Sequence, residues 1–372
     1  MKALILTTHT GGGHDAAAHA LEEALTARGA ECRVMDCVAF GGAWLSKVVS
    51  GTYVKWVQHT PRSFGRIYRF GKLISTPRLK SPVYMLNSTY AFRMEKVLEE
   101  FQPDVIVCTH IFGGQSVTHL KLHGQFKGIL AIVMTDYTLH PFTEDCQADV
   151  LFVGHHDMVR ECRDKGFAQA AVKPYGIPVS PKCRPCDDKT EAKRAAGLDP
   201  EKRQVLLVGG SMGAGNLPGT IGGLLPVLGE NDHLTVVCGS NKAAMEKAQS
   251  LYGSDSRVTV LGRVSPLYPL MAAADVLLTK SGGLTTSEAM TVGVPMVIVY
   301  PIPGCETSNA AFFEKYGLAA YARQPEEIPG KVAALLNDEA ARRAMVAAQR
   351  REIDPNAADH IASCIIDMTN EK

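Results

Sequence analysis

The chain of 372 residues lacks a long apolar run, since nowhere are 18 or more consecutive residues apolar. Its first residues already form a short apolar segment typical of a strand, so we expect neither a transmembrane helix nor a signal peptide. Close cysteine pairs are also scarce, because only Cys183 and Cys186 among ten cysteines form one. Without a second pair or histidine partners, this spacing does not indicate a zinc or redox site. Cysteines inside apolar runs, such as Cys108 and Cys238, are typical of reduced core thiols, and we expect a cytoplasmic protein.

Acidic residues are missing from a long stretch near the N-terminus. Residues 37–94 contain no Asp or Glu, where the average composition would place about six, yet they contain nine Lys and Arg. Basic residues interleaved with aromatics favour docking on an anionic membrane surface. An ordinary helical insertion with a solvated basic face is an alternative, and so is a nucleic-acid site, although tracking phosphates would require fewer apolar residues. The residues predicted to meet the membrane are Trp44, Trp56, Arg62, Arg66, Arg69 and Lys72, within a basic aromatic insertion at 40–93.

The length and the hydrophobic pattern together predict two α/β domains with parallel sheets. The chain exceeds the usual size of a single core, and three prolines between 174 and 181 indicate an interdomain linker. We expect a first domain at 1–173, a linker at 174–182, a second domain at 183–354, and a C-terminal helix at 355–372 that packs back on the first domain. Short apolar runs predict strands at 2–8, 32–37, 104–108, 129–134 and 149–153, and again at 204–208, 234–238, 257–260, 275–279 and 295–300.

A glycine-rich turn follows the first predicted strand and carries a titratable side chain. Gly11, Gly12 and Gly13 precede His14, and apolar residues then recur at helical spacing until Gly29. Strand–glycine–helix junctions lie at the ligand-binding edge of open α/β sheets, where backbone amides favour an anion and a histidine can accept a proton near neutral pH. The spacing of the glycines also fits a dinucleotide fingerprint, with Asp36 as the ribose ligand, so a dehydrogenase is an alternative. A purely structural turn is another.

Three loops in the second half have compositions typical of phosphate and sugar sites. The segment 209–216 joins a strand to a helix with four glycines, so its amides can approach a diphosphate, and no Lys-Ser/Thr follows as in an ATP-binding loop. The segment 279–289 places small hydroxyl and glycine residues at a second helix start, with Glu288 one turn later. In 300–309, Glu306 and Asn309 open a third helix. The alternative for each is a structural helix start, in which a first-turn Glu complements the helix dipole or a hydroxyl caps the helix.

Six short motifs follow one another along the chain. They are Gly11-Gly12-Gly13-His14, Thr135-Asp136-Tyr137 with His140, Tyr175-Gly176-Ile177-Pro178-Val179, Gly209-Gly210-Ser211-Met212-Gly213, Ser281-Gly282-Gly283 through Glu288, and Pro303-Gly304-x-Glu306-x-x-Asn309. In this order they resemble the family of monogalactosyldiacylglycerol synthases and processive diacylglycerol glucosyltransferases, over roughly residues 3–340. The second half is also similar to the peptidoglycan lipid-intermediate N-acetylglucosaminyltransferase. One departure is the segment His140 to Thr143, which lacks the tryptophan that commonly ends the second motif in the family.

The resemblance implies a GT-B fold, in which two Rossmann-like parallel-sheet domains face each other across a cleft. It implies that His14 is the general base, with Asp136 as its orienting partner or as an alternative base, and that Gly12, Gly13 and His140 lie on the acceptor side. Glu288 would hold the ribose, Glu306 and Asn309 the hexose, and the backbone near Val264 the uracil. The residues implied for the diphosphate are Gly210, Ser211, Gly213, Ser281 and Gly282.

The sequence therefore predicts an inverting glycosyltransferase that moves a hexose from a UDP-sugar to a diacylglycerol-type lipid. We expect it on the inner face of the cell membrane as a peripheral protein, with no nucleic-acid partner. No Asp-x-Asp motif occurs in the chain, so we expect no metal and no other cofactor. The alternatives are transfer to a polyprenyl-linked acceptor and a membrane-docked UDP-sugar-binding regulator without turnover. The dehydrogenase explains neither the second set of loops nor the basic aromatic insertion.

Overall fold

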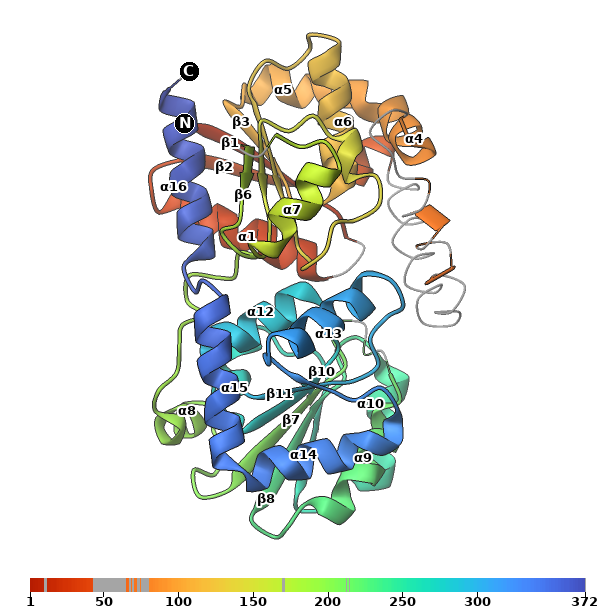
Figure 1. Cartoon of the computed structure of the whole chain (residues 1–372), viewed down its shortest axis with the longest axis vertical. Helices are drawn as coiled ribbons and strands as arrows, with labels where there is room; N and C mark the ends of the chain where they lie inside the picture. The colour runs from red at the N-terminus through yellow and green to blue at the C-terminus, as the bar shows by residue number, and fades with distance from the viewer. Residues whose placement is uncertain are drawn as a thin grey trace. The chain divides into compact units, whose positions relative to one another are not determined.

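The computed structural model describes residues 1–9, 12–42, 65–66, 68, 70–71, 74, 80–168, 171–211, 213 and 215–371. It divides into two compact units. Unit 1 comprises residues 1–182, 303–305 and 356–372, and unit 2 comprises residues 183–302 and 306–355. Each unit contains a six-stranded sheet whose paired strands all run parallel, as Figure 1 shows.

The sheet of unit 1 has the order β2-β1-β3-β4-β5-β6. Continuous apolar runs form its central strands because both faces of the sheet are covered by helices. The strands are β1 (Lys2–Thr7), β2 (Glu31–Asp36), β3 (Val105–Cys108), β4 (Ile129–Val133), β5 (Val150–Phe152) and β6 (Val172–Lys173). The helices are α1 (Gly12–Thr26), α4 (Pro82–Ala91), α5 (Glu95–Phe101), α6 (Ile111–Leu122), α7 (Asp157–Asp164) and α16 (Ala357–Asn370).

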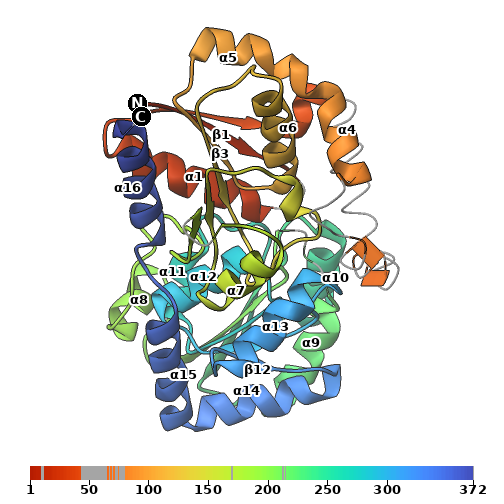
Figure 2. The same ribbon diagram turned by 45° about the horizontal axis from the view of Figure 1, so that its top comes forward.

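The C-terminal helix α16 packs beside α1 in unit 1, as both Figure 1 and Figure 2 show. Its buried face, with Ile361 and Ile365, joins Leu21 and Leu25 of α1 over the same face of the sheet. Burying an isoleucine or leucine side chain contributes roughly 1.5–3 kcal/mol. The helix that ends the chain is therefore part of the core of the first unit.

Unit 2 repeats the same design with the strand order β12-β11-β10-β7-β8-β9. Its strands are β7 (Arg203–Val208), β8 (Asp232–Val237), β9 (Val258–Leu261), β10 (Val276–Thr279), β11 (Met296–Ile298) and β12 (Ala320–Tyr321). Its helices are α8 (Lys189–Ala195), α9 (Leu217–Leu224), α10 (Lys242–Tyr252), α11 (Tyr268–Ala273), α12 (Gly283–Val292), α13 (Cys305–Lys315), α14 (Ile328–Asn337) and α15 (Glu339–Glu352). Phe313 of α13 is fully buried in this unit.

The ten strands expected from the sequence are confirmed, with ends that move by at most a few residues. The sequence missed β6 and β12, which have two residues each and lie at the edges of their sheets. Two residues cannot show the alternation or the apolar run by which a strand is recognised. The predicted α/β class with two Rossmann-like parallel sheets is confirmed.

Candidate active site

His14 lies in the first turn of α1, at the carboxyl edge of the sheet in unit 1. Its Nδ1 atom is 2.9 Å from the carbonyl oxygen of Thr109 and 3.0 Å from the hydroxyl of Thr135. Thr109 follows β3 and Thr135 follows β4, so three neighbouring strand ends meet around one imidazole. The ring of His110 stands perpendicular to it, with the ring centroids 4.6 Å apart.

Burial lowers the pKa of His14, and the charge of Asp136 acts in the opposite direction. Burial likewise lowers the pKa of His110 well below its usual range. The two imidazoles at this edge are therefore neutral near pH 7. A neutral histidine is the form that can accept a proton.

Asp136 lies next to Thr135, and its carboxylate oxygen Oδ2 is within hydrogen-bond distance of Nε2 of His140, at 2.8 Å. The sequence predicted Asp136 as the orienting partner of His14. Thr109 and Thr135 lie at the Nδ1 atom of His14, and the charge of Asp136 raises the pKa of His14, so the role of Asp136 as orienting partner stays a prediction. Its part as an alternative base stays a prediction.

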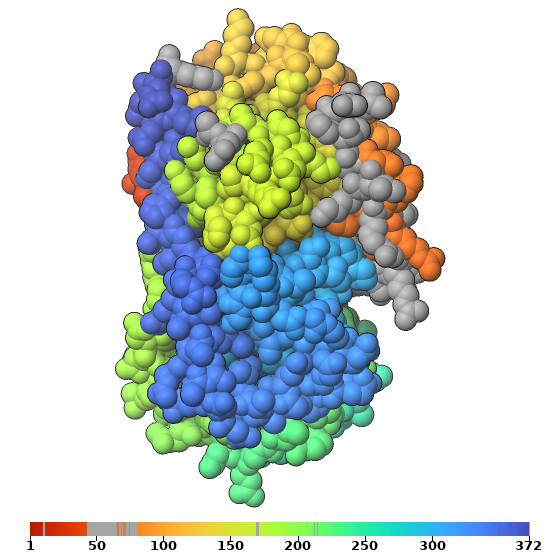
Figure 3. Space-filling model, in the orientation of Figure 1, coloured from red at the N-terminus to blue at the C-terminus, as the bar shows by residue number. Residues whose placement is uncertain are grey.

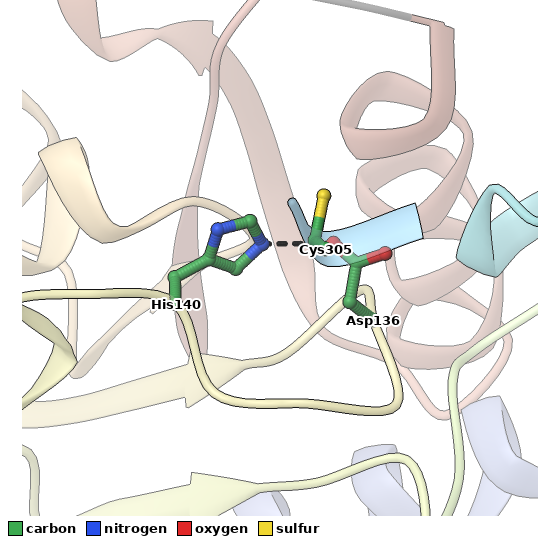
Figure 4. A group of neighbouring side chains, drawn as sticks. All are labelled: Asp136, His140 and Cys305. Atoms are coloured by element: carbon green, nitrogen blue, oxygen red, sulfur yellow. Dashed lines mark hydrogen bonds and ion pairs between the residues drawn. The ribbon is translucent and has the colours of Figure 1, made fainter. Parts of the chain in front are cut away.

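Cys305 joins Asp136 and His140 in a small group of possible ligands, which Figure 4 shows. The carboxylate, the imidazole and the thiol offer one ligand atom each, all within 4.8 Å of one another. Gly12 and Gly13 form the first residues of α1 and are half-buried. Their place beside His14 agrees with a glycine turn at a sheet edge, and their contact with an acceptor stays a prediction.

In unit 2, the glycine-rich loop after β7 needs glycine for both its conformation and its packing. Gly210 has φ 71° and Gly213 has φ 58°, which L-residues with a Cβ rarely adopt. A Cβ on Gly213 would lie 2.1 Å from the carbonyl oxygen of Cys238. Ser211 is held through its own carbonyl oxygen, which accepts hydrogen bonds from the amide and hydroxyl of Ser240. The loop thus presents its backbone closely, as a diphosphate cradle requires.

A buried ion pair connects the other two loops of unit 2. The Nζ atom of Lys280 lies 3.0 Å from Oε1 of Glu306, whose Oε2 accepts the amide of Ile302 at 2.8 Å. The hydroxyl of Ser281 donates to the carbonyl oxygen of Glu306, and the side-chain amide of Asn309 donates to the carbonyl oxygen of Ser281. Glu306 and Asn309 therefore brace the loop that carries Ser281, and their contact with a hexose stays a prediction.

Lys280 was missed by the sequence reasoning. A Cβ on Gly210 would lie 3.1 Å from Cε of Lys280, so the lysine runs directly beside the glycine-rich loop. The sequence did contain a signal, because Lys280 stands between an apolar strand and a Ser-Gly-Gly turn. In the structure this lysine is 8% exposed, which is unusual for a cation. Lys280 can supply positive charge to an anion held at that loop.

Glu288 and Val264 are the remaining donor-side predictions. Glu288 lies on α12, and burial alone raises the pKa of its carboxyl to about 7. Among the described residues, none donates a hydrogen bond that would lower this pKa. Val264 is half-buried in the loop that follows β9. Their contacts with ribose and uracil stay predictions.

Most of the residues predicted to meet a membrane, namely Trp44, Trp56, Arg62, Arg69 and Lys72, lie outside the described residues; Arg66 is described and exposed. Later in the same acid-free stretch of the sequence, large apolar side chains are exposed on unit 1. Met85 and Leu86 of α4 are 63% and 54% exposed, and Phe92 at its C-terminal end is 55% exposed. The region appears in orange on the surface in Figure 3. In the part of the chain that is described, no helix combines the length and apolarity needed to cross a bilayer.

Two family models match the chain in succession. Residues 14–179 match monogalactosyldiacylglycerol (MGDG) synthase, and residues 204–363 match the glycosyltransferase family 28 C-terminal domain. The chain belongs to the glycosyltransferase family that these two models describe in its N-terminal and C-terminal parts. The first match begins at His14 and lies within unit 1, whereas the second begins in β7, spans the sheet of unit 2 and extends into α16.

Two relatives match most of this chain. The chain is 28% identical to a processive diacylglycerol beta-glucosyltransferase of Bacillus cytotoxicus, over 98% of this chain and 93% of that protein. It is also 28% identical to monogalactosyldiacylglycerol synthase 1 of Arabidopsis thaliana, over 89% of this chain and 64% of that protein.

Solved structures confirm the GT-B fold class. MurG of Acinetobacter baumannii has a TM-score of 0.62 at 18% identity and covers 99% of this chain and 100% of its own. The glycotransferase of kitacinnamycin has a TM-score of 0.65 at 15% identity, covering 99% and 98%. At these identities the likeness extends to the fold alone. A cleft between the two units stays a prediction from the family.

Proposed function

We propose that this protein transfers a hexose from a UDP-sugar to a diacylglycerol-type lipid, with inversion at the anomeric carbon. The main support is that each unit carries a feature that this family's reaction needs, namely a candidate base in unit 1 and a candidate diphosphate loop in unit 2. Unit 1 holds a half-buried histidine with a lowered pKa at the carboxyl edge of its sheet, and unit 2 holds a glycine-rich loop with a buried lysine beside it. Relatives named for diacylglycerol glucosylation and for monogalactosyldiacylglycerol synthesis match nearly the whole chain.

In this reaction His14 takes the proton of the lipid hydroxyl, which is a poor nucleophile at pH 7. A positioned base of this kind contributes about 10²–10⁴-fold to the rate. The departing UDP gains negative charge on its diphosphate, and the amides of the loop at Gly210 and Ser211 together with the ammonium of Lys280 stabilise that charge. The N-terminus of α12 at Gly283 adds its helix dipole.

Docking of unit 1 on an anionic bilayer is part of this proposal, and it would place the protein peripherally on the inner face of the cell membrane. The exposed side chains of Met85, Leu86 and Phe92 supply apolar contact, and residues 37–94 supply nine cations without one acidic residue. Each basic residue near an anionic surface contributes about 1 kcal/mol to binding. Arg93, beside Phe92, and Lys80, at the start of α4, lie close enough in sequence to act with the apolar side chains.

Product formation from lipid vesicles is the test of the activity. The full chain is incubated with radiolabelled UDP-glucose, UDP-galactose or UDP-N-acetylglucosamine and vesicles that contain diacylglycerol. We expect a labelled glycolipid whose linkage is inverted relative to the donor. Label on a polyprenyl-linked acceptor alone would replace the lipid assignment, and UDP binding without product from any pairing would identify a regulator.

Vesicle flotation tests the docking surface separately. Met85→Ser, Leu86→Ser and Phe92→Ser combined should weaken binding to anionic vesicles, and salt should weaken the wild type, because surface charge is screened over about 8–10 Å at physiological ionic strength. Leu251→Ser is the matched control, since Leu251 is 55% exposed on α10 of unit 2. Equal binding of the triple variant and the control would reject this surface.

Transfer should need no metal ion. The donor-side charge is met by Lys280 and by main-chain amides, and no Asp-x-Asp motif is present to chelate a cation. Activity should therefore persist in EDTA. Loss of activity in EDTA that zinc restores would contradict this and would direct attention to Asp136, His140 and Cys305.

A further inference from the structure

The two groups that contact Nδ1 of His14 differ in what they can do chemically. The contact at 2.9 Å is with the main-chain carbonyl oxygen of Thr109, which can only accept a hydrogen bond. Nδ1 must therefore carry the proton of the neutral ring. The hydroxyl of Thr135, 3.0 Å away, is then the second acceptor of a bifurcated hydrogen bond from the same N–H. The lone pair of the neutral imidazole is therefore on Nε2.

The same residues also fix the place of the ring. The hydroxyl of Thr109 donates to the carbonyl oxygen of His14 at 3.1 Å, so Thr109 holds both the side chain and the backbone of this residue. The ring of His110 closes one side, and its own Nδ1 is occupied by the amide of Phe112. In a serine-protease triad a carboxylate performs this task, whereas here the carboxylate of Asp136 is paired with His140.

We propose that Thr135 is a positioning residue that, together with the carbonyl of Thr109, holds His14 in the Nδ1–H tautomer and thereby makes Nε2 the atom that receives the acceptor proton. The inference rests on the proposed role of His14 as the base. It adds an assignment of the reacting nitrogen and of the hydroxyl that supports it. An acceptor at Nδ1 stabilises the imidazolium more than the neutral ring, so Thr135 also makes Nε2 more basic.

The charged and titratable groups around His14 are few. Asp136 and His140 follow β4, His110 caps α6, and Asp15 lies on α1 itself. The carboxylates of Asp136 and Asp15 raise the pKa of His14, whereas His140 lowers it. Replacing Thr135 leaves all four of these groups in place. A shift in the pH profile of a Thr135 variant therefore reports the lost hydroxyl.

The first experiment compares Thr135→Val with Thr135→Ser in the full chain. Valine should lower kcat/KM at its pH maximum by about tenfold, which corresponds to one hydrogen bond to a charged group. The acid limb of the kcat/KM profile should also move to lower pH, because the imidazolium loses an acceptor. Serine should restore both values. Thr118→Val is the matched control, since Thr118 is fully buried and donates to the carbonyl of Gly114 on α6.

A second readout does not depend on turnover. Nitrogen-15 NMR of histidine-labelled protein should show His14 with a protonated Nδ1 and an unprotonated Nε2 at pH 8. The opposite tautomer, or a Thr135→Val profile that falls in height without moving along the pH axis, would overturn the inference. If His14→Ala retains wild-type turnover, the base role itself fails. The tautomer measured by NMR still decides the structural part.

Discussion

Replacing Glu288 by glutamine should change how both stability and UDP affinity depend on pH. Burial raises the pKa of this carboxyl from 4.5 to about 7, and no described residue offers it a positive partner. In the unfolded chain the group ionises near 4.5. The folded state therefore holds the proton more tightly than the unfolded state. Stability must fall as the pH rises from 4.5 to 7, and the loss is complete above pH 7.

The magnitude follows from the size of the pKa shift. One pKa unit corresponds to 1.36 kcal/mol, so a shift from 4.5 to about 7 amounts to about 3 kcal/mol at pH 8. At pH 4 both states of the wild type are protonated, and the variant should differ little. In a domain of this size about 3 kcal/mol moves Tm by roughly 6–12 °C. The Tm of Glu288→Gln minus the Tm of the wild type should thus increase by up to this amount between pH 4 and pH 8.

Calorimetry of the full chain measures this difference in Tm. The relevant unfolding transition is the one whose Tm increases when UDP is added. Glu326→Gln is the control, because Glu326 is exposed in the same unit. UDP binding provides the functional half of the test: ribose hydroxyls donate to the ionised carboxylate, so wild-type affinity should rise from pH 5 to pH 8. The glutamine variant should bind more weakly and without this dependence. Parallel pH profiles for the wild type and Glu288→Gln, in Tm and in UDP affinity, would refute the reasoning.

Four further substitutions test the site and the contacts that support it. His14→Ala should lower kcat by about 10²–10⁴-fold and leave the Kd for UDP unchanged, and near wild-type turnover would exclude the base role. Lys280→Met should weaken UDP binding and cost about 3–5 kcal/mol of stability, because it leaves the buried carboxylate of Glu306 without its cation. Adding Glu306→Gln should recover stability but not UDP affinity in the same titration. Asp145→Ala removes the acceptor of Ser81 and Gln115 and should cost about 2–3 kcal/mol in urea unfolding, with looser α4 docking and weaker vesicle binding.

The sheets could be predicted from sequence because their information is local. β3 and β4 are fully buried apolar runs, and β1 is buried from Ala3 to Thr7 with an apolar run at its centre. The helical face of α1 follows from its alanine and leucine spacing in the same way. Edge strands as short as β6 and β12 carry no such pattern.

The partners of His14 could not be predicted because they are far away in the chain. Thr109 and Thr135 are 95 and 121 residues from His14, and only the parallel order β1-β3-β4 brings these strand ends together. The family resemblance pointed to Asp136, which is the neighbour of the residue that makes the contact. The parallel strand order brings the end of β4 to His14, where Thr135 contacts Nδ1 and Asp136 acts through its charge, so an orienting role of Asp136 stays a prediction.

The two units use opposite electrostatic solutions, and each suits its proposed task. The two contacts at Nδ1 of His14 are uncharged, a carbonyl oxygen and a hydroxyl, while the carboxylates of Asp136 and Asp15 act on the ring through their charge alone. A base must be neutral before it acts and must tolerate a positive charge afterwards, which dipoles provide without a permanent ion pair. In unit 2 the permanent cation of Lys280 is held by Glu306 beside the glycine-rich loop. Because a diphosphate arrives already charged, a preformed cation with a balancing carboxylate can meet it without desolvating an isolated charge in the empty site.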